Sequence, residues 1–157
     1  METFEFKWTN SNDEDFKKFY LITEEYYSRI VGGLENRRAF VPYNISDSIQ
    51  DVVIAYKDNK AAGCAGLKAY SPTDAEVKRV WVEPDYRGQR LATKLMECIE
   101  AKAKEQNFQR TILQTREIMQ DAVSLYRKLG YQQIADYPPY DKLAGAVCFA
   151  KNLCQKS

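Results

Sequence analysis

Two arginines and a glycine lie in a short polar turn, where they could bind an anion. The turn contains Arg87, Gly88 and Arg90, and a helical pattern of residues follows it. The first N–H groups of a helix lack intrahelical partners and carry partial positive charge. Guanidinium groups beside such amides suit a phosphate. The same pattern also fits an ordinary connection between a strand and a helix, so the turn alone leaves both interpretations open.

A predicted strand and a predicted helix position this turn. The alternation along Glu76–Glu83 predicts a strand, with Val77, Arg79 and Trp81 on one face and Lys78, Val80 and Val82 on the other. Pro84 ends the strand. After the turn, apolar residues recur at helical spacing: Leu91, Ala92, Leu95, Met96, Ile99 and Ala103. The predicted helix runs to about Asn107.

The N-terminal third of the chain predicts a strand, a helix and an irregular stretch. Phe4, Phe6 and Trp8 alternate with polar residues, which predicts a strand with one buried face. Ser11 and Glu14 have the spacing of a capping box, and the apolar stripe after them predicts a helix that stops at Gly32-Gly33. Residues 34–50 show no period and predict a loop or a short helix.

The remaining segments predict a mixed sheet. Val52–Lys57 and Ala61–Tyr70 form a hairpin around Asp58-Asn59-Lys60, and a strand over Thr111–Thr115 should lie parallel to the Glu76–Glu83 strand. A helix carries Ile118, Ala122, Leu125 and Leu129 and ends at Gly130; strands over Tyr131–Ala135 and Ala146–Ala150 flank an aromatic loop, Tyr137–Asp141. The prediction is an α/β (α+β) fold with a mostly antiparallel sheet of six to seven strands and about four helices.

Composition narrows the function classes. The chain has 157 residues, which predicts a single domain over 1–157, and a formal charge of +1, which argues against a nucleic-acid binder. It contains no histidine, and its four cysteines form no CxxC pair, so no metal site is expected. Free cysteines fit a reducing cytoplasm. Neither an export signal nor a membrane span is expected, because no long apolar run occurs.

Two motifs in this order of elements resemble the GNAT acyltransferase family. Arg87-Gly88-Gln89-Arg90-Leu91-Ala92 is similar to the family's pyrophosphate loop, Q/R-x-x-G-x-G/A. The segment from Ala122 to Tyr131, AVSLYRKLGY, is similar to its A-x-x-L-Y-x-x-x-G-F/Y junction between a helix and a strand. The resemblance covers nearly the whole chain and implies the GNAT acyl-CoA N-acyltransferase fold, with acetyl-CoA as the donor substrate and no metal.

The resemblance also implies roles for individual residues. The cofactor-binding residues would be the pyrophosphate loop, Arg87, Gly88, Gln89, Arg90, Leu91 and Ala92, together with the strand end Val80, Trp81 and Val82, which would offer backbone groups to pantetheine. Glu76 would accept the proton of the amine, either directly or through water, or else be a solvated carboxylate on a strand. Tyr126 would protonate the sulfur of CoA, or else be a core aromatic. Arg90 replaces the usual glycine, and helical φ and ψ are expected there without strain.

The implied function is acetyl transfer from acetyl-CoA to a primary amine of a small molecule or peptide, directly in a ternary complex. The alternative is a catalytically inactive acyl-CoA-binding module with a regulatory role; a nucleic-acid-binding role is disfavoured by the charge. The acceptor is unidentified, and its cleft is expected between residues 26–43 and the Tyr137–Asp141 loop. Arg37 and Arg38 could recognise a carboxylate or simply face solvent. A homodimer is left open.

Overall fold

The computed structural model describes residues 3–30 and 49–153, and its strands form one seven-stranded sheet. The helices and strands run in this order: β1 (Glu5–Thr9), α1 (Glu14–Ile30), β2 (Asp51–Lys57), β3 (Lys60–Ala69), β4 (Asp74–Val82), α3 (Leu91–Glu105), β5 (Arg110–Arg116), α4 (Gln120–Lys128), β6 (Gln132–Ile134) and β7 (Ala146–Asn152). Single 3₁₀ turns lie at Pro84–Tyr86 and Tyr140–Lys142. Three α-helices are thus present among the described residues.

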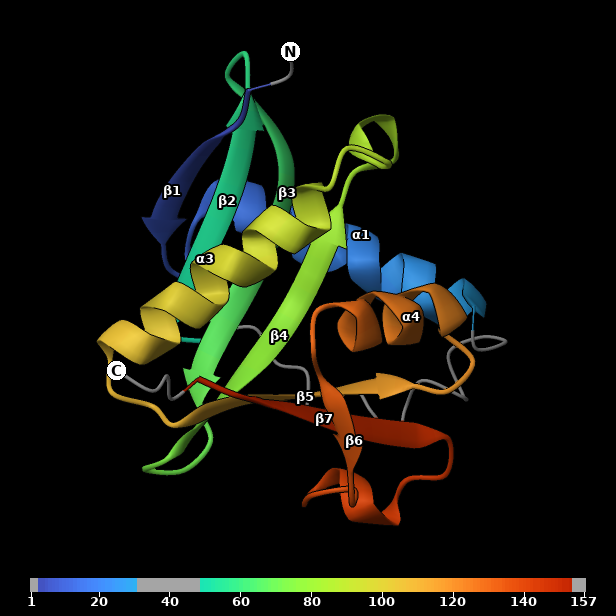
Figure 1. The fold of residues 1–157 in the computed structure, drawn as a ribbon. Coiled ribbons are helices and arrows are strands. Elements are labelled where there is room, and N and C mark those ends of the chain that lie inside the picture. Colours follow the sequence, from blue (N-terminus) through green and yellow to red (C-terminus); the bar gives the residue numbers. More distant parts are fainter. Residues whose placement is uncertain (1–2, 31–48, 154–157) are drawn as a thin grey trace.

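The strand order is β1-β2-β3-β4-β5-β7-β6, and the sheet is antiparallel except at one pair (Figure 1). The β2–β3 hairpin turns at Asp58 and Asn59, whose φ values of 51° and 66° are those of a type I′ turn. β4 and β5 are parallel, as a helical connection between neighbouring strands requires. These observations confirm the predicted hairpin, the parallel pair and the mixed sheet.

Helices cover both faces of the sheet (Figure 1). On one face, α3 packs Leu91, Leu95, Met96 and Ile99 into the largest apolar cluster, which α4 also joins. On the other face, α1 buries Phe16 and Phe19 against β2, β3 and Trp81. The segment between β6 and β7 places Tyr137 and Tyr140 over β5 and β7 as a third cluster. The sheet is therefore the centre of a three-layer arrangement.

A β-bulge in β4 breaks the alternation that the sequence predicts. Gly66 pairs with Lys78 and Cys64 with Trp81, so two residues of β4, Arg79 and Val80, lie opposite one of β3, and Arg79 has a φ of 56°. The bulge moves Trp81 to the α1 face, while Val77 stays on the α3 face. The prediction that Val77 and Trp81 share a face was therefore wrong, because a bulged residue shifts the period of two.

Three local predictions were wrong for identifiable reasons. Asp13, rather than Ser11, caps α1, since its Oδ1 accepts hydrogen bonds from the N–H groups of Asp15 and Phe16 at 2.9 and 3.1 Å. Ile118 precedes α4 and is 57% exposed, so it is outside the apolar stripe. Trp8 is exposed on β1, where Lys102 Nζ lies 4.6 Å from the centre of its ring.

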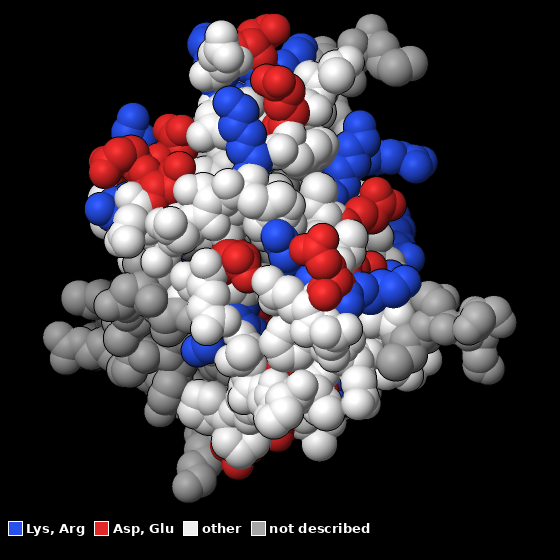
Figure 2. Space-filling view, turned by 90° about the vertical axis from the view of Figure 1, so that its left-hand side faces the viewer, with Lys and Arg blue, Asp and Glu red and all other residues white. Residues whose placement is uncertain are grey.

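Some predictions fall on parts of the chain that the structure does not describe. They are the helix stop at Gly32-Gly33, most of the irregular stretch over 34–50, and the arginines Arg37 and Arg38. Within residues 3–30 and 49–153, no helix is both long enough and apolar enough to cross a membrane. On the side of the molecule nearest β1, Figure 2 shows basic and acidic side chains interspersed, in keeping with a net charge of +1.

Candidate active site

The strands β4 and β5 are paired at one end and separate toward the other. Their ladder consists of three pairs, Asp74 with Arg110, Ala75 with Thr111 and Glu76 with Ile112. Beyond Glu76, β4 continues to Val82 and β5 to Arg116, and the two strands run in diverging directions (Figure 1). The divergence opens one edge of β4 over the stretch that contains Val80, Trp81 and Val82. Backbone groups on such an edge can pair with an extended ligand.

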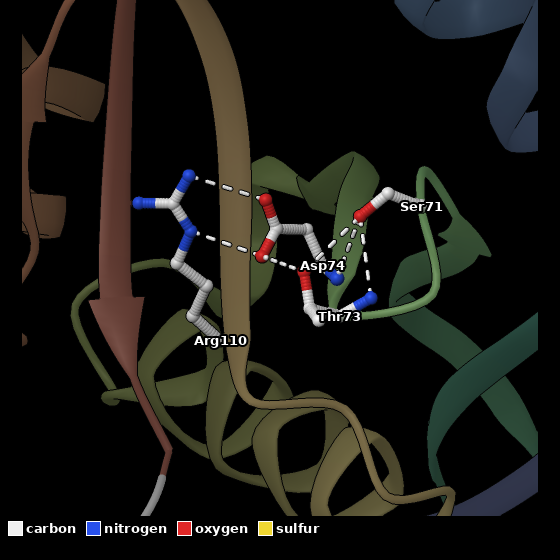
Figure 3. A network of polar contacts seen from close by, with 4 residues as sticks. All are labelled: Ser71, Thr73, Asp74 and Arg110. Carbon is white, nitrogen blue, oxygen red and sulfur yellow. Dashed lines mark hydrogen bonds and ion pairs between the residues drawn. The ribbon is translucent and has the colours of Figure 1, made fainter.

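A polar network closes the paired end (Figure 3). The Arg110 guanidinium donates from Nε and Nη2 to the two carboxylate oxygens of Asp74, at 3.0 and 3.1 Å. The Ser71 Oγ accepts hydrogen bonds from the backbone N–H groups of Thr73 and Asp74, and the Thr73 hydroxyl donates to Asp74. Since a bidentate pair is geometrically specific, this network fixes the point from which β4 and β5 diverge.

The predicted pyrophosphate loop lies at the open end, between β4 and α3. The Arg87 Nε donates to the Val82 carbonyl oxygen at 2.9 Å, and the guanidinium lies 4.9 Å from the centre of the Trp81 ring. The side chain of Arg87 is therefore folded back onto the end of β4. Gly88 has a φ of 82°, a conformation that glycine adopts readily.

Arg90 is the residue before the first turn of α3, and its conformation differs from the expectation. Its φ and ψ are 62° and 23°, in the left-handed region, so the expected right-handed helical backbone was wrong. A left-handed residue is costly for any side chain with a Cβ. The backbone at this position therefore has the conformation that favours glycine. Leu91 is buried beneath the loop and anchors the start of α3.

Glu76 lies inside a buried polar cluster at the point where β4 leaves β5. It is 3% exposed, and its Oε2 accepts a hydrogen bond from the Tyr137 hydroxyl at 2.8 Å. Lys78, on the same face of β4, is 7% exposed; its Nζ lies 3.9 Å from Glu76 Oε2 and donates to the Tyr140 hydroxyl at 2.8 Å. Glu76 is therefore a buried, hydrogen-bonded carboxylate and not the solvated one that was the alternative.

Burial changes the acidity of this cluster. Desolvation is the main cause that lowers the pKa of Lys78 to about 8, and the nearby carboxylate of Glu76 opposes it. The pKa values of Tyr137 and Tyr140 are raised, first by burial and then by the negative charge of Glu76. Both phenols thus remain protonated at neutral pH and can donate hydrogen bonds.

Tyr126 lies on α4 on the other side of the sheet. It is buried in the cluster that α3 forms, and its ring meets that of Tyr131 edge to face at 5.9 Å. The structure thus places Tyr126 in the α3 cluster and Glu76 in the Tyr137–Tyr140 cluster. The open end of β4 lies between the pyrophosphate loop and the β4–β5 pairing.

Known proteins share this arrangement of sheet, loop and helices. The sequence model of the Acetyltransferase (GNAT) family matches residues 8–131. The chain belongs to the GNAT acetyltransferase family. Its GNAT fold is also found in a GNAT acetyltransferase from Staphylococcus aureus Mu50, with a TM-score of 0.73, 19% identity, and coverage of 97% of this chain and 100% of that one.

Two further GNAT structures hold the cofactor. PaiA N-acetyltransferase from Thermoplasma acidophilum, in complex with coenzyme A, has a TM-score of 0.74 at 15% identity and covers 96% of this chain and 99% of its own. A GNAT acetyltransferase from Elizabethkingia anophelis with acetyl-CoA bound has a TM-score of 0.71 at 12% identity, and the match covers 97% and 99% of the two chains. At these identities the likeness shows the fold.

Relatives by sequence match a shorter region. An IAA acetyltransferase from Azospirillum brasilense is 28% identical over 89 residues, which are 56% of this chain and 58% of the relative. The uncharacterised N-acetyltransferase YjgM of Escherichia coli K12 is 33% identical over 75 residues, 48% of this chain and 44% of the relative. The match thus spans about half the length of these curated GNAT relatives.

Sequence reasoning missed part of the cluster around Glu76. Lys78 entered only as a member of the alternating pattern, and the Tyr137–Asp141 loop only as one wall of a cleft. One signal was available, because residues two apart on a strand share a face, so Lys78 had to lie beside Glu76. Among the described residues of this GNAT chain, no cluster of three acidic or cysteine side chains could hold a metal ion.

Proposed function

We propose that this chain is an acetyl-CoA-dependent N-acetyltransferase that moves the acetyl group directly to a primary amine of a small molecule or peptide. The separation of β4 from β5 beyond Glu76 carries the proposal, since it opens a strand edge that ends at the polar loop Arg87–Ala92. Family membership supports the donor, as GNAT structures of the same fold hold CoA or acetyl-CoA.

The residues divide into binding and chemical roles. The backbone of Val80, Trp81 and Val82 would pair with the pantetheine arm. The diphosphate would lie over the loop, Arg87, Gly88, Gln89, Arg90, Leu91 and Ala92, whose first helical N–H groups and cations suit an anion. The backbone at the end of β4 would also polarise the thioester carbonyl.

The chemistry needs a proton acceptor and a proton donor. The amine loses a proton to Glu76, its nitrogen bonds to the thioester carbon, and the C–S bond breaks. Tyr126 gives a proton to the departing thiolate and regains one from the nitrogen. A phenol of pKa ~10 is protonated at neutral pH and can donate to a thiolate.

Ligand-dependent unfolding tests the donor assignment. Acetyl-CoA at about 100 times its dissociation constant should raise the free energy of unfolding by ~2.7 kcal/mol, because it binds only the folded state. The measurement is thermal denaturation with acetyl-CoA, and with adenosine as a control that lacks the diphosphate and the thioester. An unchanged melting temperature at millimolar acetyl-CoA would contradict the proposal.

Two substitutions test the chemistry with any amine that a screen identifies. Tyr126→Phe should retain acetyl-CoA binding and slow turnover by about 10²-fold or more, while Tyr131→Phe, which removes the other phenol of the same ring pair, should retain turnover. Glu76→Gln should slow turnover most at low pH, where the amine is hardest to deprotonate. Its control is Glu105→Gln at an exposed site on α3. Equal rates in Tyr126→Phe and the parent would remove the proton-donor role.

A further inference from the structure

Four buried residues form one polar cluster, in which Glu76 lies close to a second proton-binding group, Lys78. Glu76 and Lys78 come from β4, and Tyr137 and Tyr140 from the segment that leads into β7. Lys78 Nζ and the Tyr140 hydroxyl are 2.8 Å apart, and Tyr140 also hydrogen-bonds to Glu76, which is one cause of its raised pKa. The hydroxyl of Tyr140 thus bridges the ammonium and the carboxylate. Bridged groups of this kind can exchange a proton without moving apart.

A second base lies within reach of the Glu76 carboxylate. The carboxylate accepts a hydrogen bond from the Tyr137 hydroxyl and lies 3.9 Å from the Lys78 ammonium. An amine is a stronger base than a carboxylate, so a proton that Glu76 takes from the substrate can pass on to the Nζ of Lys78, which the Tyr140 hydroxyl contacts at 2.8 Å.

We propose that Lys78 is the final acceptor of the proton that the substrate amine loses, with Tyr140 as the relay from Glu76. This rests on the proposed acetyl transfer and adds a residue to its chemistry. The substrate ammonium protonates Glu76; Tyr140 then gives its hydroxyl proton to the neutral Lys78 Nζ and takes the proton of Glu76. The products of this transfer are one neutral substrate amine, which can attack the thioester, and one Lys78 ammonium, which later loses its proton to water.

The surroundings of Lys78 favour this role. Burial lowers its pKa to about 8, and the cations Lys68 on β3 and Arg79 on β4 lower it further, while Glu76 raises it. Burial also raises the pKa values of Tyr137, Tyr140 and Cys148 on β7, that of Cys148 to about 12, so these three groups are neutral. The carboxyl groups on this side are those of Asp136, which hydrogen-bonds to Cys148, and Asp141, which acts on Tyr70, whose ring packs on Tyr137. A proton acceptor works best when its pKa lies near the operating pH.

A lysine titration tests whether Lys78 loses its proton near pH 8, and it needs no substrate amine. Protein labelled with ¹³C and ¹⁵N at lysine is titrated by NMR from pH 6 to 11, and Lys78→Met assigns the signal; Lys104→Met, at an exposed site on α3, is the control. One lysine should titrate near pH 8 and vanish only in Lys78→Met. If Lys78 titrated above about pH 10 in a protein that binds acetyl-CoA, this inference alone would be overturned. Failure to bind acetyl-CoA would overturn the proposed function and this role with it.

The pH profile of turnover tests the role itself. With an amine of pKa above about 9, kcat/KM of the parent should rise with pH through a limb near 8, because Lys78 must be neutral to accept the proton. Lys78→Met and Lys78→Arg should lose that limb and keep only the one set by the amine, with Lys78→Arg retaining the positive charge. Tyr140→Phe should keep the lysine titration and lower the rate. A limb unchanged in Lys78→Met would refute the role.

Discussion

The two ends of the β4–β5 pair are built on opposite principles. At the closed end, Asp74 and Arg110 hold the strands together with paired side chains and three ladder pairs. At the open end, Arg79, Gly88 and Arg90 all have positive φ, and the edge of β4 faces the gap. The closed end uses its polar groups within the protein, whereas the open end leaves an edge of β4 unpaired with β5 and has strained backbone at Arg79 and Arg90. The site is thus placed by the closed end and shaped by the open one.

Lys78, two residues past the last ladder pair, should give the largest effect, through the pH dependence of stability. Its pKa is lowered to about 8 in the folded protein, so the unfolded chain holds one more proton between pH 8 and about 10.5. Stability from this residue therefore rises with pH across that window, by up to about 1.4 kcal/mol per pH unit.

The measurement is urea unfolding of the parent and of Lys78→Met at several pH values. The substitution can change the absolute free energy of unfolding at every pH. Between pH 8 and 10.5, however, the free energy of unfolding of the parent should increase by roughly 3 kcal/mol relative to that of Lys78→Met. Lys104→Met provides the exposed control. Parallel curves for the parent and Lys78→Met would mean that the open end does not desolvate this lysine.

At Gly63, β3 packs closely against the open end of β4. A Cβ there would lie 2.6 Å from the Trp81 carbonyl oxygen and 3.3 Å from a methyl group of Leu95, so Gly63→Ala must push β4 away. Overpacking of this kind costs about 1–3 kcal/mol. We expect a lower melting temperature, altered Trp81 fluorescence and weaker acetyl-CoA binding.

The control for Gly63→Ala is Gly88→Ala. A Cβ at position 88 would meet nothing within 4 Å, but the alanine backbone would have to adopt a φ of 82°. Gly88→Ala should lose stability through the backbone alone and leave the fluorescence of Trp81 unchanged. If both substitutions had the same effect on Trp81, close packing at Gly63 would not be what positions the end of β4.

Substitutions at the closed end should change stability less than those at the open end. Asp74→Ala and Arg110→Ala should each lower stability, and the double-mutant cycle should give a coupling of about 0.5–1 kcal/mol, because the Arg110 side chain is 38% exposed and screened by solvent. The exposed pair Lys17–Glu14 is the control, with a coupling near zero. Acetyl-CoA affinity should change little. A large loss of affinity would mean that the closed end shapes the site as well as placing it.

The same contrast explains what the sequence could predict. The parallel β4–β5 pair, the hairpin and the loop before α3 follow from local periodicity and turn residues, so they were predictable. The bulge at Arg79 was not, because a period of two assumes that no residue is inserted, and Arg79 has no sequence signature for positive φ. Its side chain ion-pairs with Glu24 of α1 at 2.6 Å, a contact that depends on tertiary packing.

The cluster around Glu76 was only half predictable for a related reason. The strand period places Lys78 beside Glu76, but Tyr140 is 62 residues away from Lys78 in the chain. Which face the Tyr137–Asp141 loop covers depends on the path of the chain between β6 and β7. Local patterns therefore locate the candidate base, whereas its hydrogen-bond partners require the fold.

Arg90→Gly should have the smallest effect and separates strain from charge at the open end. Glycine relieves the left-handed conformation, which costs roughly 1–2 kcal/mol, but loses about 0.5–1 kcal/mol in the entropy of the unfolded chain. The net gain should therefore be about 1 kcal/mol or less. Loss of the guanidinium should also weaken acetyl-CoA binding and make that binding less sensitive to salt.

The measurements for Arg90→Gly are urea unfolding and calorimetric titration at two salt concentrations. Arg90→Asn is the matched variant, since asparagine tolerates positive φ and likewise lacks the charge. If Arg90→Gly bound acetyl-CoA as tightly as the parent at low salt, the arginine would be a strained replacement for glycine and not a phosphate contact.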